Sequence, residues 1–228
     1  MNNQLRRGST PNEIRDRIAQ ALGLVNGLND IPFGLLVEAT SGYRVVPINV
    51  CDNEDIELIK TLDESARRLI KACSNTRRFH GNRINDIGSM MESEVLGEIS
   101  NRNIKPQQLG RKGYPDSKII QRSITNRDLL RITYLEIKVS SVDWDGRFRT
   151  FYYSNGKKIM EDARHILLGL KVIEESDKYW KAVSYKLIDL SRINVSLKAE
   201  YNASNNDIYI KSGGELLINK EGLSYRRI

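Results

Sequence analysis

The spacing of apolar residues along the chain predicts three helices ahead of a series of strands. Apolar side chains recur at every third or fourth position within residues 11–27, 54–72 and 82–100, which is the period of a helix with one buried face. Thr10 stands at the expected N-cap position of the first segment. In the third segment the apolar stripe consists of Ile84, Ile87, Met91, Val95 and Ile99. We therefore expect three helices, each with an apolar face.

Alternating and β-branched segments predict strands over most of the remaining chain. Residues 35–39 and 43–50 flank Thr-Ser-Gly and are read as a hairpin. Further strands are expected near residues 116–122, 131–141, 147–153, 163–173 and 180–190, with a tight turn at Asp145-Gly146 and a polar, basic connection at 101–112. This order predicts an α/β (α+β) fold, in which a central mixed β-sheet is flanked by helices.

The chain length suits one domain with a substantial core. Within 228 residues we distinguish an N-terminal helical and hairpin region (1–81), a core (82–190) and C-terminal strands (191–228). The N-terminus lacks the apolar stretch of a signal peptide, and no segment approaches the roughly 20 apolar residues of a membrane span. Cys51 and Cys73 are expected to be reduced thiols. The sequence thus predicts a soluble, cytoplasmic protein without membrane partners.

The charge balance adds a candidate partner. Lys and Arg number 36 against 29 Asp and Glu, which gives a net charge of +7. A basic protein of this kind favours acidic partners, of which nucleic acid is the commonest.

Two short motifs carry the candidate chemistry. Pro115-Asp116 precedes a predicted strand, and Glu136-Ile137-Lys138 lies within the alternating segment 131–139. Because residues two apart on a strand share a face, Glu136 and Lys138 are expected to point the same way. Two carboxylates can hold a hard divalent cation, and an ammonium group beside them can position or activate water. The residues therefore indicate hydrolysis of a phosphodiester.

This arrangement resembles the PD-(D/E)xK nuclease superfamily, and type II restriction endonucleases within it most of all. The resemblance covers residues 82–190 and implies a restriction-endonuclease-like core. It implies that Asp116 and Glu136 bind one or two metal ions, that the main-chain carbonyl of Ile137 adds a ligand, and that Lys138 holds the attacking water. Mg²⁺ is the expected ion, with Mn²⁺ able to substitute, since the ligands are all oxygen atoms. The implied products carry a 5′-phosphate and a 3′-hydroxyl.

The resemblance also implies a glutamate on the preceding helix, often one turn after a glycine. Gly88 and Glu92 match that spacing, so Glu92 is the expected accessory metal ligand, with Glu98 as the alternative. The competing interpretation is a glutamate at the flank of the helix, paired with a surface arginine.

Basic residues near the motif are candidate DNA contacts. Residues 147–158 interleave basic and aromatic side chains, and a polar loop precedes Pro115. The alternative is an amphipathic strand whose aromatic residues belong to the core. The candidates are Arg147, Arg149, Lys157, Lys158, Arg111 and Lys112, followed by Arg77 and Arg78.

Histidine usage excludes other nuclease chemistries. The chain has only two histidines, His80 and His165, and lacks the His-x-Lys motif of the phospholipase D type. The leading hypothesis is a type II restriction endonuclease that cuts double-stranded DNA at a short sequence. A homodimer would match a palindromic site, and a DNA methyltransferase is the expected genetic companion. A repair nuclease, a junction resolvase and a non-catalytic DNA-binding module remain as alternatives.

Overall fold

The computed structural model describes residues 10–26, 28–99, 103–110, 113–126, 128–142, 144, 152–153 and 157–197. The chain divides into two compact units. One consists of Met1–Asn29 with Ser196–Ile228, and the other of Asp30–Val195. No helix in the described part of the chain is both long and apolar enough to cross a membrane.

The first unit contains helix α1, Pro11–Asn26, where the sequence predicts it. Its first turn is a reciprocal cap. The Glu13 N–H donates to Thr10 Oγ1 at 3.3 Å, and the Thr10 N–H donates to Glu13 Oε2 at 2.8 Å. Both donors would otherwise lack a partner within the helix, so the cap stabilises this end.

The second unit is built on a six-stranded sheet with the order β2-β7-β6-β5-β4-β3. Only β5 and β6 run parallel; the other neighbours are antiparallel. This confirms the predicted mixed sheet flanked by helices. The strands are β2 (Phe79–His80), β3 (Ile104–Gln108), β4 (Ser117–Arg122), β5 (Leu130–Ser140), β6 (Arg164–Ser176) and β7 (Tyr179–Asp189).

One segment predicted to be a connection contains a strand, and one predicted strand lies mostly outside the described residues. Strand β3 lies inside the segment expected to be a polar connection. It is an edge strand with one fully buried residue, Ile104, so it shows almost no apolar alternation. The predicted strand 147–153 and the Asp145-Gly146 turn fall mostly outside the described residues. Tyr152 and Tyr153, which are described, are not in a strand.

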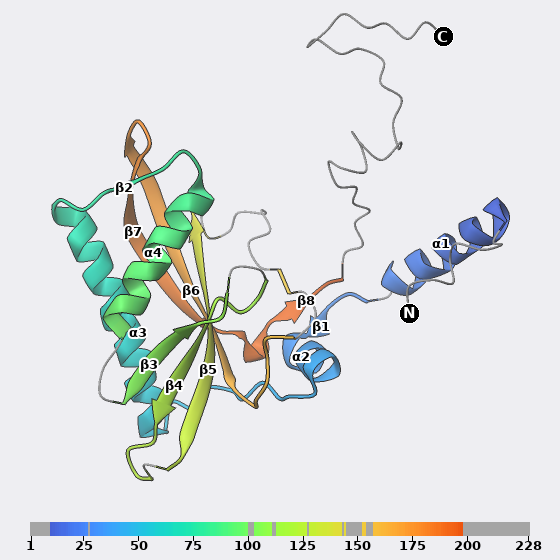
Figure 1. Ribbon diagram of the computed structural model, residues 1–228, viewed down its shortest axis with the longest axis horizontal. Helices are drawn as coiled ribbons and strands as arrows, with labels where there is room; N and C mark the ends of the chain where they lie inside the picture. Colours follow the sequence, from blue (N-terminus) through green and yellow to red (C-terminus); the bar gives the residue numbers. More distant parts are fainter. Residues whose placement is uncertain are drawn as a thin grey trace, which may run out of the picture. The chain divides into compact units, whose positions relative to one another are not determined.

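Helices α3 (Asn53–Asn75) and α4 (Ile84–Ile99) cover one face of the sheet, and both are predicted correctly. Figure 1 shows them side by side against the strands. Their apolar stripes meet the inward residues of β5, β6 and β7 in the main core, which includes Leu58, Leu62, Met91, Val95, Leu135, Ile137, Leu168 and Leu170.

The predicted hairpin over residues 35–50 is wrong. Phe33–Ser41 form helix α2, and the following residues are extended with one bridge, Val45 to Ala163. A short apolar run fits either a strand or a helix. Here Phe33 and Val37, four residues apart, are both fully buried, and Gly42 ends the helix with φ +81°. Two short strands, β1 (Ile31–Pro32) and β8 (Asn194–Val195), pair beside it.

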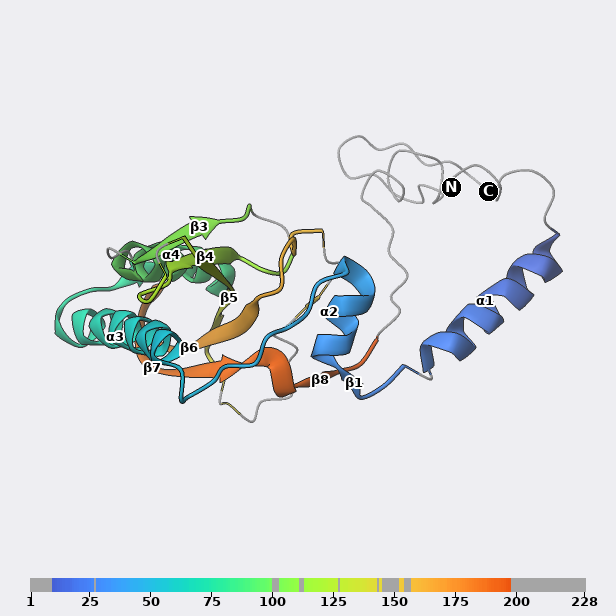
Figure 2. The same ribbon diagram turned by 90° about the horizontal axis from the view of Figure 1, so that it is seen from below.

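Helix α2 packs on the face of the sheet opposite α3, as Figure 2 shows. The second core cluster joins Phe33 and Val37 to Tyr134 and Tyr114. His165 is fully buried there, 2.6 Å through Nδ1 from the Tyr114 hydroxyl. This cluster therefore anchors the residue that precedes Pro115-Asp116.

The buried imidazole should make stability depend on pH. Burial lowers the pKa of His165 from 6.5 to about 3, because the charged form is penalised. Between these values the unfolded chain binds a proton that the folded protein does not. The free energy of unfolding should therefore fall by up to about 1.4 kcal/mol for each pH unit below about 6.5.

Urea denaturation of the wild type and of His165→Leu at several pH values between 6.5 and 4 measures this contribution. The variant should be less stable at neutral pH, because the hydrogen bond between the Tyr114 hydroxyl and His165 Nδ1 is lost. Its stability should nevertheless decline less steeply with acid. Parallel curves for the two proteins would contradict the expected role of His165.

Candidate active site

The site forms where β5 runs past the beginning of β4. Ser117, the first residue of β4, pairs with Leu135, whereas β5 continues to Ser140. Among the residues that the structure describes, the edge of β5 from Glu136 onward therefore has no ladder partner on the β4 side. Asp116 lies at this opening, immediately before β4.

Main-chain hydrogen bonds orient both carboxylates. The Asp116 N–H donates to Glu136 Oε2 at 3.1 Å, and the Ile137 N–H donates to Asp116 Oδ2 at 3.0 Å. In a strand the N–H and C=O of one residue point toward the same neighbour. The carbonyl of Ile137 therefore also faces Asp116, and three oxygen-bearing groups converge at the open edge.

Lys138 completes the cluster. Its Nζ lies 2.5 Å from Glu136 Oε1 and 3.9 Å from Asp116 Oδ2. Glu136 is only 2% exposed, and burial raises the pKa of its carboxyl group to about 7 although Lys138 opposes the shift. Asp116 and Lys138 are half-buried and reach the solvent. The three residues that the sequence pairs are thus in direct contact.

A groove of about 810 Å³ gives access to this cluster. One wall is α4 and the other is formed by the ends of β3 and β5. The lining residues include Gly88, Glu92, Gln108, Asp116, Ile137 and Lys138. The groove is therefore large enough to admit a phosphate group of a nucleotide.

Of the two candidate helical glutamates, the structure brings Glu92 to the groove. Gln108 Nε2 donates to Glu92 Oε1 at 3.3 Å. Burial and the nearby charge of Asp116 raise the pKa of Glu92. Glu98 instead accepts from Arg68 at 3.0 Å, which is the surface pairing considered as the alternative for this helix. The sequence missed Gln108, because its segment was read as a connection.

The donor set fits a hard cation with an incomplete protein shell. Asp116, Glu136 and the Ile137 carbonyl supply only oxygen atoms, the ligands that Mg²⁺ and Mn²⁺ prefer. Within the described residues, no group of three or more His, Cys, Asp or Glu side chains is placed to hold a metal ion, so side chains alone do not supply a complete set of ligands here. An ion held here would keep positions for water and for phosphate oxygens, as Mg²⁺ sites usually do.

Lys158, a predicted DNA contact, directs its ammonium group at the loop before Asp116. Its Nζ donates to the carbonyls of Gly110, Gly113 and Pro115 at 3.2, 2.6 and 2.9 Å. Lys157 is exposed beside it. The other predicted contacts, Arg147, Arg149, Arg111 and Lys112, lie outside the described residues.

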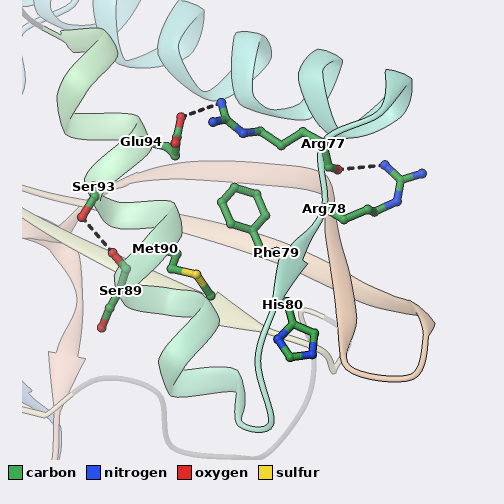
Figure 3. Close-up of a pocket in the computed structure, with 8 residues that line it drawn as sticks. All are labelled: Arg77, Arg78, Phe79, His80, Ser89, Met90, Ser93 and Glu94. Carbon is green, nitrogen blue, oxygen red and sulfur yellow. Dashed lines mark hydrogen bonds and ion pairs between the residues drawn. The ribbon is translucent and has the colours of Figure 1, made fainter.

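A second hollow, of about 610 Å³, lies between β2 and the middle of α4. It contains Arg77 and Arg78, which the sequence offers as phosphate contacts. Figure 3 shows Arg77 directed at Glu94, and the distance between these groups is 2.8 Å. Arg78 pairs with Glu175. Because both guanidinium groups already have acidic partners, this hollow is a weak candidate for binding an anion.

Comparison with known proteins agrees with this geometry. Residues 27–212 match the model of the type II restriction enzyme MjaV family. A relative from Methanocaldococcus jannaschii, the type II restriction enzyme MjaV, is 31% identical over 206 residues. The match covers 82% of this chain and 89% of that protein. A family match over most of the chain, around a cluster of two carboxylates and a lysine, shows that this chain belongs to the MjaV family of type II restriction enzymes.

Proposed function

We propose that this type II restriction enzyme hydrolyses DNA with Asp116, Glu136 and Lys138. The observation that carries the proposal is their convergence at the open edge of β5, where Lys138 Nζ lies 2.5 Å from Glu136. The family is one of site-specific DNA endonucleases, so the substrate is double-stranded DNA. The groove beside α4 admits the scissile phosphate.

Type II restriction enzymes generally need a divalent metal ion, and the site has suitable ligands. Asp116, Glu136 and the carbonyl of Ile137 would hold the ion, with Glu92 as an accessory ligand on the other wall of the groove. A bound Mg²⁺ would neutralise charge on the phosphate and lower the pKa of water. The same oxygen donors would also accept Mn²⁺.

Lys138 has a separate task. Its ammonium group lies on the Glu136 side of the cluster and is half-buried, so it can donate a hydrogen bond to water at the mouth of the site. The same charge stabilises the extra negative charge that develops on the phosphate oxygens during attack. Attack in line with the leaving oxygen would release a 5′-phosphate and a 3′-hydroxyl.

The biological setting follows from restriction. An enzyme that cuts a short sequence in foreign DNA also threatens the DNA of its host, so a DNA methyltransferase of the same specificity is the expected companion. A homodimer would present two such sites to the two strands of a palindrome. The enzyme would act in the cytoplasm.

The test is cleavage of plasmid DNA with Mg²⁺ by the wild type and by Asp116→Asn. The wild type should give discrete fragments, and the variant should lose cleavage by at least about a hundredfold, because one ligand loses its charge. Asp177→Asn makes the same change on an exposed turn and should cut normally. Cleavage restricted to branched DNA, or full activity of Asp116→Asn, would refute the proposal.

A further inference from the structure

Beyond the catalytic cluster, one row of residues crosses three strands on the face of Glu136. Lys138 of β5 is in register with Gly169 of β6, and Gly169 with Lys186 of β7. Residues paired across a sheet point to the same side. Two lysines therefore flank a glycine on the face that carries the catalytic ammonium group.

The space above Gly169 is filled by Trp144. A Cβ at position 169 would lie 3.1 Å from Trp144 Cζ3, tighter than ordinary packing, and 3.6 Å from Leu167 Cδ2. The glycine thus allows the indole ring to rest directly on the sheet. The ring remains 41% exposed, so it forms part of the surface and is not a core residue.

Lys186 is held by this ring. Its Nζ lies 5.1 Å from the centroid of the Trp144 ring, within the range of a cation–π contact. No carboxylate in the described part of the chain forms an ion pair with Lys186. Lys181, at the other end of the same strand, shows the contrast, because it lies 2.7 Å from Glu175. The charge of Lys186 is therefore positioned by the indole ring and has no acidic partner among the described residues.

The spacing suits a phosphate backbone. Two strand separations place Lys186 about 10 Å from Lys138. Phosphates recur about every 3.4 Å along the axis of one DNA strand. Because the backbone also winds around the axis, successive phosphates are further apart through space than this rise. A strand whose scissile phosphate lies at Lys138 would therefore bring the next phosphate, or the one after it, to Lys186.

We propose that Lys138, Gly169 and Lys186, with Trp144 resting on Gly169, form a surface on which the enzyme seats the DNA backbone beside the scissile phosphate. We call it the Trp144 strip. The proposal rests on the proposed function, since Lys138 places the scissile phosphate. DNA is the occupant because the strip offers positive charge on the catalytic face, where no described carboxylate pairs with Lys186, and the chain carries a net charge of +7. The indole supplies an apolar surface for the sugar or base between the two phosphates.

The two tryptophans of the chain permit a direct test by fluorescence. Trp180 is half-buried near the start of β7, where its Nε1–H donates to the Gly81 carbonyl at 3.2 Å. Trp180→Phe leaves Trp144 as the only tryptophan, and Trp144→Phe leaves Trp180. Excitation at the long-wavelength edge of the indole absorption avoids the emission of the ten tyrosines. Without divalent metal, titration with a duplex that contains the mapped cut site should change the emission of Trp144 and leave that of Trp180 constant.

A second measurement tests the charge. Lys186→Gln should bind the same duplex about 5- to 10-fold more weakly at 0.1 M salt, and the slope of log affinity against log salt should fall by about one. Lys181→Gln removes the same charge from an ion pair at the other end of β7 and should retain the wild-type slope. Equal thermal melting of the two variants would show that the difference arises in binding.

The proposal that the Trp144 strip binds DNA would be refuted by two results together: unchanged Trp144 emission, and a wild-type slope of log affinity against log salt for Lys186→Gln. The loss of cleavage by Asp116→Asn would still stand, so the strip can fail without the active site failing. If the protein neither binds nor cuts DNA, both proposals fall together.

Discussion

Replacing Lys138 by methionine should slow DNA cleavage about 10²–10³-fold at saturating DNA and metal, which is the usual effect of losing one group that stabilises charge in a transition state. Methionine retains much of the apolar stem and removes the ammonium group that lies 2.5 Å from Glu136 Oε1. Single-turnover rates with excess enzyme measure the chemical step without product release.

Two features separate this effect from weaker binding. Loss of one phosphate contact lowers DNA affinity by only about tenfold at 0.1 M salt, and saturating enzyme removes that difference. Lys181→Met, which loses its contact with Glu175 at a distance from the site, should cut at the wild-type rate. A wild-type rate for Lys138→Met under saturation would mean that Lys138 only neutralises Glu136.

The cluster of Asp116, Glu136 and Lys138, for which we propose catalysis, could be predicted because its geometry is local to two strands. Alternation along β5 places Glu136 and Lys138 on one face, and antiparallel pairing of β4 with β5 brings Asp116 to Glu136. The sequence alone does not decide which glutamate of α4 lies at the site. Glu92 and Glu98 both flank the apolar stripe of α4, and the distinction depends on Gln108 and Arg68, which come from other elements.

The buried ion pairs of α3 could not be predicted, because the paired residues are distant in sequence. Glu54 and Asp55 are buried at the start of α3, where local rules expect solvent-exposed acids. Their partners are Arg131 on β5 and Arg164 on β6. Buried charges are tolerated when paired, but no local pattern near residue 54 indicates arginines more than 70 residues away.

Lys158 has contacts in the structure that its position in the sequence does not indicate. Its position in a basic and aromatic segment predicts a phosphate contact. In the structure its ammonium group donates to the carbonyls of Gly110, Gly113 and Pro115, which precede Asp116. This geometry favours a positioning role, in which Lys158 holds the loop so that the Asp116 carboxylate meets Glu136.

Lys158→Met should therefore impair use of the metal ion more than binding of DNA. Without the three hydrogen bonds the loop gains freedom, and Asp116 is held less firmly against the Ile137 N–H. Loss of a group that orients a metal ligand typically costs about 10- to 100-fold in metal affinity or activity. The Mg²⁺ concentration for half-maximal cleavage should rise by that factor, while metal-free DNA affinity stays within about twofold.

Lys157→Met is the matched control, since it removes the same charge from the neighbouring exposed residue. It should keep the wild-type Mg²⁺ requirement. Lys158→Arg retains positive charge and several donors, so it should recover part of the lost metal response. If Lys158→Met instead binds DNA more weakly and keeps the wild-type Mg²⁺ requirement, its ammonium group turns to the phosphate backbone when DNA binds. In that case Lys158 contacts the carbonyls of the loop only in the free enzyme.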